Sequence, residues 1–223
     1  MSSSTPNLAD REYVLNVGRC FDRGWDIFQK NTWGFIGFIL LFGLSNILFS
    51  LTSEILAEED TSISYGVRQL LFFYQILIAP VIYAGLWIVP LEIARNRTVR
   101  FGDFFSGFYR YWSILLVTNI TYLSISAGLI FLLIPGIALF TLYKFSLPLV
   151  IDRNLNFWLA METSRQIIMK NFFSFLMLDI LVVFLNLAGL LMMGVGILFT
   201  LSWSICVQIA AYESVVGLSP SRR

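Results

Sequence analysis

Two ionisable side chains, Lys144 and Asp179, lie inside long apolar runs and are the strongest candidates for chemistry in this chain. Charged residues deep in a membrane-spanning segment are rare, and they often serve as proton or ion relays. The structural alternative is an ion pair between helices, or a lysine whose ammonium reaches the headgroups. Lys144 precedes Ile151 by seven residues and Asp179 follows Phe172 by seven, so we expect the two at one depth, facing the interior. A single pair offers few groups for a pathway, which favours the structural interpretation.

Three asparagines, Asn46, Asn119 and Asn186, also lie inside apolar runs. They could line a polar path through a membrane. Side-chain amides in membrane helices more commonly form hydrogen bonds between helices. We therefore expect them to join neighbouring spans.

Basic and aromatic residues alternate in the segment 95–111. The arginines are Arg95, Arg97, Arg100 and Arg110, interleaved with Phe101, Phe104, Phe105, Phe108 and Tyr109. This composition is typical of a segment at the membrane surface, where each basic residue contributes about 1 kcal/mol of attraction to anionic lipids. The same charges also set the topology of the flanking spans. Both roles can hold together.

Other site chemistry has little support in the sequence. The chain contains no His, and its two cysteines, Cys20 and Cys206, are far apart and outside any CxxC motif. No phosphate-binding glycine loop, GxSxG or HExxH is present. We expect no metal, no cofactor and no enzymatic activity. A lipid-modifying enzyme is disfavoured because no group of carboxylate, His or Cys residues gathers at one predicted interface.

The composition indicates a protein that spans a membrane several times. Of 223 residues, 57% are hydrophobic and 13% charged, against about 45–50% and about 25% in soluble domains. With 15 Lys and Arg against 14 Asp and Glu, the net charge is +1, too little to neutralise the phosphates of a nucleic acid. Soluble enzymes, disordered chains and nucleic-acid binders are therefore excluded.

Six apolar runs approach the roughly 20 residues needed to cross a bilayer. They are predicted over residues 33–51, 70–94, 112–134, 136–151 and 172–190, and from the turn at 194–196 to about residue 212. Pro80 and Pro90 predict a kinked second span whose freed carbonyls are satisfied by neighbours or water. Pro135 and Gly136 predict the turn between spans three and four.

Amphipathic segments precede spans one, three and five. In residues 11–30 the apolar positions follow a helical spacing: Val14, Val17, Phe21, Trp25 and Phe28. The segments 95–111 and 155–171 are also predicted to lie flat at the membrane surface. We expect Asp152 to cap the helix in the last of these segments.

A repeat with the order amphipathic segment, span, turn, span occurs three times, over about 11–94, 95–151 and 152–213. A shift of 140 residues lays Lys30-Asn31 on Lys170-Asn171 and Phe35 on Phe175. Each unit crosses twice, so the repeats are parallel, whereas many transporters use inverted ones. The predicted fold is therefore all-α, a single six-helix bundle over 11–215 with tails at 1–10 and 216–223.

The distribution of charge predicts the orientation. If the N-terminus is cytoplasmic, all of the 15 Lys and Arg except Lys144 and Arg68 lie inside or at the inner surface. Glu54, Glu58, Glu59 and Asp60 lie outside. This agrees with the positive-inside rule and predicts a multi-pass bacterial inner-membrane protein with both termini in the cytoplasm.

Three stretches carry a resemblance to a known group. They are Pro135-Gly136, Phe145-Ser146-Leu147-Pro148-Leu149-Val150-Ile151-Asp152-Arg153 and Trp158-Leu159-Ala160-Met161-Glu162-Thr163-Ser164. Roughly residues 110–215 resemble uncharacterised bacterial six-span membrane proteins, which are similar to the membrane domain sometimes joined to glycerophosphodiester phosphodiesterases. The resemblance implies six spans and no known activity, because the phosphodiesterase chemistry belongs to a separate soluble domain.

The sequence favours a non-enzymatic scaffold, accessory subunit or bilayer organiser. Its partners would be the lipid bilayer, including anionic lipids, and either another membrane protein or a second copy of the chain. The alternative is a small transporter or channel that uses Lys144 and Asp179. A continuous polar cavity reaching Asp179 would favour transport, and a dry, filled interior would favour the scaffold.

Overall fold

The computed structural model describes residues 14–56, 62–131, 133–192 and 195–219, and within these ranges the chain is helical with no strand. Six helices are long and apolar enough to cross a membrane. They cover Thr32–Ile55, Tyr65–Ala94, Phe101–Ile130, Ile134–Arg153, Phe172–Leu191 and Val195–Val216. The all-α architecture with six apolar spans is therefore confirmed. The predicted tail 1–10 lies outside the described residues.

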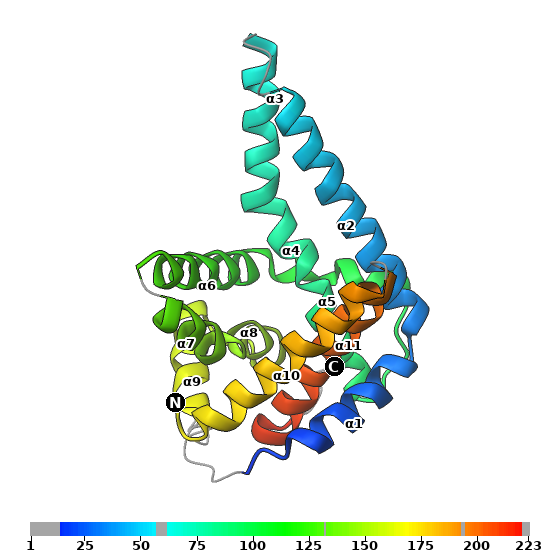
Figure 1. Ribbon diagram of the computed structural model, residues 1–223, viewed down its shortest axis with the longest axis vertical. Coiled ribbons are helices and arrows are strands. Elements are labelled where there is room, and N and C mark those ends of the chain that lie inside the picture. Colours follow the sequence, from blue (N-terminus) through cyan, green and yellow to red (C-terminus); the bar gives the residue numbers. More distant parts are fainter. Residues whose placement is uncertain (1–13, 57–61, 132, 193–194, 220–223) are drawn as a thin grey trace.

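Three helix pairs diverge from a common base (Figure 1). They are α2 (Thr32–Ile55) with α3 (Ser62–Phe73), α6 (Tyr111–Phe131) with α7 (Leu133–Tyr143), and α10 (Phe172–Leu191) with α11 (Val195–Val216). Only 17% of the apolar window of α2 is buried, 22% of that spanning η3 and α6, and 28% of that of α10. These helices are apolar on every side, and the hydrophobic effect does not drive helices together in lipid.

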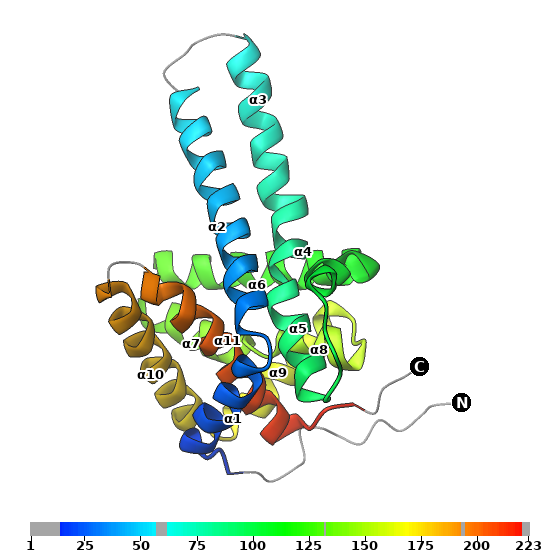
Figure 2. The same ribbon diagram turned by 90° about the vertical axis from the view of Figure 1, so that its right-hand side faces the viewer.

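The packed core lies at the base, opposite the free end of α2 and α3 (Figure 2). It contains large side chains with less than 2% exposure, including Phe28, Phe35, Phe38, Phe104, Phe145, Phe175 and Tyr212. Phe104 lies against two of these rings, with centroids 5.6 Å from Phe35 and 4.5 Å from Phe38. The base therefore holds the three pairs together.

The second span is interrupted next to Pro80, whereas Pro90 lies inside the continuous helix α5 (Gly85–Ala94). From α3 the span passes through a π-helical turn, η2 (Tyr74–Ile78), into α4 (Ala79–Tyr83) and α5. Pro80 has no N–H to donate to the carbonyl of Ile76, four residues earlier. The Asn119 amide of α6 donates to that carbonyl at 3.1 Å. A neighbouring helix thus satisfies a carbonyl freed by proline, as expected.

Helix α6 ends at Phe131 and α7 begins at Leu133, so Pro135 and Gly136 lie inside α7 and not between the two spans. Pro135 occupies the first turn of α7, where a backbone N–H would have no helical partner. Gly136 lets α7 approach α6, because a Cβ there would lie 2.7 Å from the Leu129 nitrogen. The predicted position of the turn was therefore wrong by a few residues.

The first amphipathic helix, α1 (Val17–Gln29), packs on α11. Its buried residues are Cys20, Gly24, Ile27 and Phe28. A Cβ on Gly24 would lie 2.7 Å from the Val207 backbone, so the two helices are in close contact. Of the apolar residues predicted to face the headgroups, Val14 is 94% and Trp25 40% exposed, whereas Phe28 is buried in the protein. Residues 11–13 of the predicted segment lie outside the described residues.

The segment 95–111 forms a 3₁₀ helix, η3 (Phe101–Arg110), that packs on α5. A Cβ on Gly85 would lie 1.9 Å from the Phe104 carbonyl oxygen, so only glycine permits this approach. Phe104 and Gly107 are buried, while Phe101, Phe105, Phe108 and Tyr109 are exposed. The aromatic residues of this segment are therefore divided between the core and the surface.

The fourth span is interrupted at Lys144 and Phe145, between α7 and α8 (Ser146–Arg153). Pro148 cannot donate to the Lys144 carbonyl, which breaks the helix there. Ser164 of α9 (Phe157–Met169) bridges the break: its Oγ accepts from the Phe145 N–H at 3.2 Å and donates to the Leu142 carbonyl at 2.6 Å. One hydroxyl thus joins the two halves of the span.

The cap of α9 is Asn156, whose side chain accepts from the Leu159 N–H at 2.8 Å. Asp152, the expected cap, instead belongs to α8. The chain between α8 and α9 has a residue in the left-handed region, Asn154 (φ 57°), which delays the start of α9 beyond the reach of Asp152. The expectation for Asp152 was therefore wrong.

Local structure recurs at the 140-residue shift. Helices α1 and α9 each have 13 residues and begin after capping asparagines, Asn16 and Asn156. Each is joined to the following span by an asparagine of similar conformation: Asn31 has φ −150° and ψ 43°, and Asn171 has φ −135° and ψ 43°. The middle segment differs, because η3 is a 3₁₀ helix.

Candidate functional site

Lys144 and Asp179 form a buried ion pair, as their matched depth predicts. Lys144 Nζ lies 2.9 Å from Asp179 Oδ1, and the Thr141 hydroxyl donates to Asp179 Oδ2 at 2.8 Å. The residues are 8% and 6% exposed. The pair joins the α7–α8 break to α10, two segments of different helix pairs.

Aromatic rings surround the Lys144 ammonium. Its nitrogen lies 4.9 Å from the centroid of the Phe175 ring and 5.8 Å from that of Phe145, distances at which a cation is attracted to a ring face. Both Asp179 oxygens are already hydrogen-bonded. The site is therefore a compensated ion pair in an aromatic setting.

Each intramembrane asparagine bonds to a neighbouring element. Asn46 accepts from Gln75 at 3.0 Å, Asn186 donates to Ser204 at 2.9 Å, and Asn119 donates to the Ile76 carbonyl. Every one of the three also donates to the carbonyl four residues earlier in its own helix. The three positions link α2 to η2, α10 to α11 and α6 to η2. Interhelical bonding is thus confirmed.

Asp152 is the centre of a charged network at the base. Its side chain is fully buried and pairs with Arg95. It also accepts from the Tyr212 hydroxyl at 2.8 Å and from the Ser219 hydroxyl at 2.9 Å. Arg153 Nε lies 3.1 Å from Asp152 Oδ2. The carboxylate therefore joins the ends of α5, α8 and α11.

Two further carboxylates lie near the ends of α5 and α11. Glu92 pairs with Arg95 at 2.5 Å and with Arg97 at 2.7 Å. Glu213 accepts two hydrogen bonds of 3.0 Å from Arg23, which raise the pKa of the Arg23 guanidinium. Each returning span thus ends with a carboxylate held by arginine. The Arg23–Glu213 pair could not be predicted from sequence spacing, because its members are 190 residues apart.

The four arginines assigned to lipid headgroups have different surroundings. Arg95 and Arg97 are engaged by carboxylates, and Arg110 donates to the Val150 and Ile151 carbonyls near the end of α8 at 3.1 and 2.6 Å. Arg100 is exposed, and its guanidinium forms no ion pair with the part of the chain that the structure describes. Arg100 is thus the most accessible of the four to a headgroup.

The C-terminal segment packs beyond the boundary at 215. Helix α11 ends at Val216, Gly217 has a φ of 72°, and Ser219 bonds to Asp152 through its N–H and hydroxyl. Arg153 donates to the carbonyls of Val216 and Gly217 at 3.1 and 2.8 Å. Residues 216–219 therefore belong to the packed domain, and 220–223 lie outside the described residues.

Within the described ranges, no group of three or more His, Cys, Asp or Glu is placed to hold a metal ion. Cys20 and Cys206 are free and buried, and burial raises the pKa of the Cys20 thiol. Comparisons of the chain with protein-family models, curated proteins and solved structures find no match. Its function is therefore inferred from its own residues.

Proposed function

We propose that this chain is a non-enzymatic bacterial inner-membrane protein that acts as a scaffold, accessory subunit or bilayer organiser. The divergence of the three helix pairs carries this proposal (Figure 1). Their outer halves expose large apolar side chains, among them Leu44, Leu48, Ile130, Phe184 and Leu191. Apolar area of this size needs lipid or another membrane protein to cover it.

The contacts at the base favour a platform that is built from three parallel repeats. Each unit's first helix packs on the returning span of the unit before it: η3 on α5, α9 on α8, and α1 on α11. The last of these contacts closes the ring between the first and third units. We propose that this base faces the cytoplasm, with η3 and Arg100 near the inner-leaflet headgroups and both termini on the same side.

The alternative, a small transporter or channel, has less support. Both Asp179 oxygens are bonded and the Lys144 side chain is 2% exposed, so neither group is ready to exchange protons with water. We also propose membership of the uncharacterised six-span group that residues 110–215 resemble. Membership of this group would imply a six-span fold but no known activity.

Photo-crosslinking in native membranes tests the scaffold proposal. A benzophenone amino acid is placed at Leu44 or Phe184, which are exposed, and at Phe35, which is buried, as the control. We expect one discrete adduct, to a membrane protein or to a second copy, at an exposed position and none at Phe35. Lipid adducts alone at both exposed positions would contradict the scaffold and accessory-subunit roles.

A proton-flux measurement tests the alternative that the protein is a transporter or channel. Purified protein is reconstituted in vesicles containing a pH-sensitive dye, and a proton gradient is imposed. We expect equal leakage for the wild type and the Lys144→Met/Asp179→Leu double variant. Faster leakage through the wild type would overturn the proposal.

A further inference from the structure

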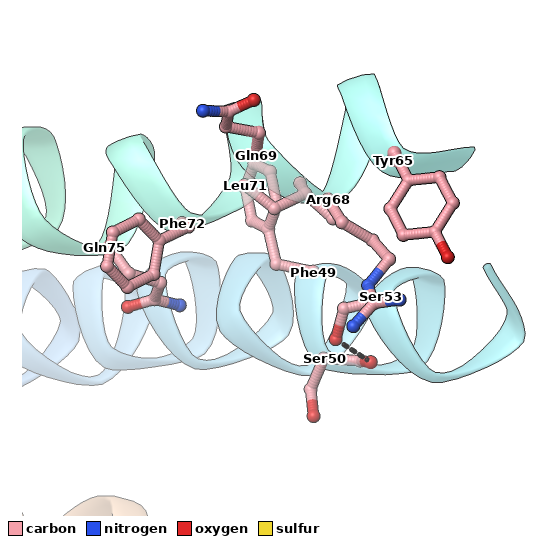
Figure 3. Close-up of a pocket in the computed structure, with 9 residues that line it drawn as sticks. All are labelled: Phe49, Ser50, Ser53, Tyr65, Arg68, Gln69, Leu71, Phe72 and Gln75. Carbon is pink, nitrogen blue, oxygen red and sulfur yellow. Dashed lines mark hydrogen bonds between the residues drawn. The ribbon is translucent and has the colours of Figure 1, made fainter. Parts of the chain in front are cut away.

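A cavity of about 630 Å³ lies between α2 and α3, near their free ends. Its lining includes Phe49, Ser50 and Ser53 of α2, Arg68 and Phe72 of α3, and Gln75 (Figure 3). Sites for small molecules have volumes of about 300–1,000 Å³ and combine apolar walls with a few polar groups. Size and lining both suit an amphiphilic ligand.

The floor of the cavity is fixed by two contacts. The Phe49 ring stacks on Tyr74 with centroids 4.2 Å apart, and Gln75 donates to Asn46 at 3.0 Å. Tyr74 and Gln75 begin the π-helical turn η2, and such turns occur frequently at functional sites. The helices are therefore held together below the cavity.

The glycines of α2 and α3 at positions 43 and 66 do not make the close contacts that join the other two pairs. In those pairs, added Cβ atoms would be crowded: one on Gly136 would lie 2.7 Å from the Leu129 nitrogen, and one on Gly196 would lie 2.6 Å from the Gly189 carbonyl oxygen. A Cβ on Gly43 or Gly66 would meet nothing within 4 Å. Contacts of this kind therefore do not close the space between α2 and α3.

Arg68 supplies a cation at this cavity that has no acidic partner among the residues that the structure describes. It is the only Lys or Arg between Lys30 and Arg95. Its side chain is exposed, and no carboxylate of the described residues pairs with it. Figure 3 shows the guanidinium extending from α3 towards Ser53. A planar guanidinium matches the oxygen atoms of a phosphate.

The depth of the lining residues in the membrane indicates that a phosphate bound by Arg68 would belong to a lipid headgroup. At about 1.5 Å per residue, Phe49 lies about 26 Å and Ser53 about 32 Å along α2 from Thr32. The hydrocarbon core of a bilayer is about 30 Å thick. Phe49 and Phe72 therefore lie at the depth of acyl chains, and Ser53 and Arg68 at the depth of headgroups.

We propose that this cavity binds a glycerophospholipid of the outer leaflet. The Arg68 guanidinium pairs with the phosphodiester, and an acyl chain lies against Phe49 and Phe72. The assignment to the outer leaflet rests on the proposed orientation, whereas the recognition of a phospholipid by Arg68 does not.

Native mass spectrometry of the full-length protein in detergent tests the proposal, with dioctanoyl phosphatidylglycerol as probe. Loss of a charge-assisted hydrogen bond lowers affinity about tenfold or more, and we expect this for Arg68→Gln. Ser53→Phe, which fills the cavity, should lower it as well. Arg19→Gln is the matched control, because Arg19 is exposed on α1 at the base, and it should leave the affinity unchanged.

Two further probes identify the recognised group. Dioctanoylglycerol, which has no phosphate, should bind the wild type and Arg68→Gln equally. Inorganic phosphate at the same concentration should not displace the phospholipid. Displacement would show that the cavity is a simple anion site and would contradict the proposal that it binds a phospholipid. Equal phospholipid affinity of wild type and Arg68→Gln at equal melting temperature would overturn the role of Arg68. If Arg68→Gln fails to fold, unchanged affinity in Ser53→Phe would overturn the site.

Discussion

At the scale of single residues, the buried charges of this chain are compensated by partners on other elements. Asp152 and Arg95 are separated by 57 residues, and Lys144 and Asp179 by 35. Isolated charges are very costly in a low-dielectric interior, and removing one member of a buried pair leaves the other uncompensated. These pairs therefore fix which helix ends meet.

Removal of Asp179 should destabilise the protein more than removal of the whole pair. We expect Asp179→Leu to cost about 3–5 kcal/mol, because Lys144 is left buried without a counter-ion. The Lys144→Met/Asp179→Leu double variant should recover part of that loss. Unfolding in mixed detergent micelles measures both, with Thr141→Val, which removes one hydrogen bond, as a milder control at about 0.5–1.5 kcal/mol. Additive losses in the double variant would contradict direct coupling.

Asn119 should matter because of Pro80. Asn119→Leu removes the donor to the Ile76 carbonyl, at an expected cost of about 0.5–1.5 kcal/mol, the net contribution of a typical hydrogen bond. Pro80→Ala restores a backbone N–H that can bond this carbonyl. Asn119→Leu should therefore cost less in the Pro80→Ala background, as measured by the same unfolding experiment. Equal costs in the two backgrounds would mean that Asn119 acts elsewhere.

At the scale of elements, helix ends and close contacts determine how the base is assembled. Helix α1 depends on Gly24, which lies against the backbone of Val207 in α11. Glu213 of α11 and the Ala94 carbonyl of α5 both bond to Arg23 of α1. One short helix therefore connects the first and last units.

A methyl group at Gly24 should weaken this connection. We expect Gly24→Ala to lower the unfolding free energy by about 1–3 kcal/mol, because the added Cβ forces α1 away from α11. Gly43→Ala is the matched control. Its Cβ meets nothing within 4 Å, and alanine in a helix interior is favoured over glycine by about 0.5–1 kcal/mol. Thermal unfolding in one detergent compares the two, and equal effects would contradict the close contact.

The sequence predicted elements better than their contacts. Apolar length identified six spans, and matched depth identified the Lys144–Asp179 pair. Periodicity did not predict that α1 buries Cys20 and Gly24, because small residues pack closely without adding to an apolar pattern. Nor did it predict the Arg95–Asp152 contact, since local spacing carries no information on which helix ends meet. The divergence of the helix pairs was also missed, because apolar spans do not specify their neighbours in lipid.

At the scale of the whole molecule, the three pairs return to one base. The ends of α5, α8 and α11 meet around Asp152, and α1 lies at the same end of the molecule (Figure 2). In a chain that crosses a membrane in three hairpins, the second span of each hairpin ends on the side from which the first span started. The excess of Lys and Arg at this base predicts that the side is the cytoplasm.

Cysteine labelling of intact cells with a membrane-impermeant maleimide tests this orientation. The native Cys20 and Cys206 should react slowly, because both are buried and burial raises the pKa of the Cys20 thiol, which lowers its thiolate fraction. Glu54→Cys, at the free end of α2, should be labelled in intact cells. Arg100→Cys and Gln166→Cys, on exposed positions of the base, should react only after permeabilisation. The reverse pattern would invert the molecule and move the Arg68 cavity to the inner leaflet, while phospholipid binding in detergent would be unaffected.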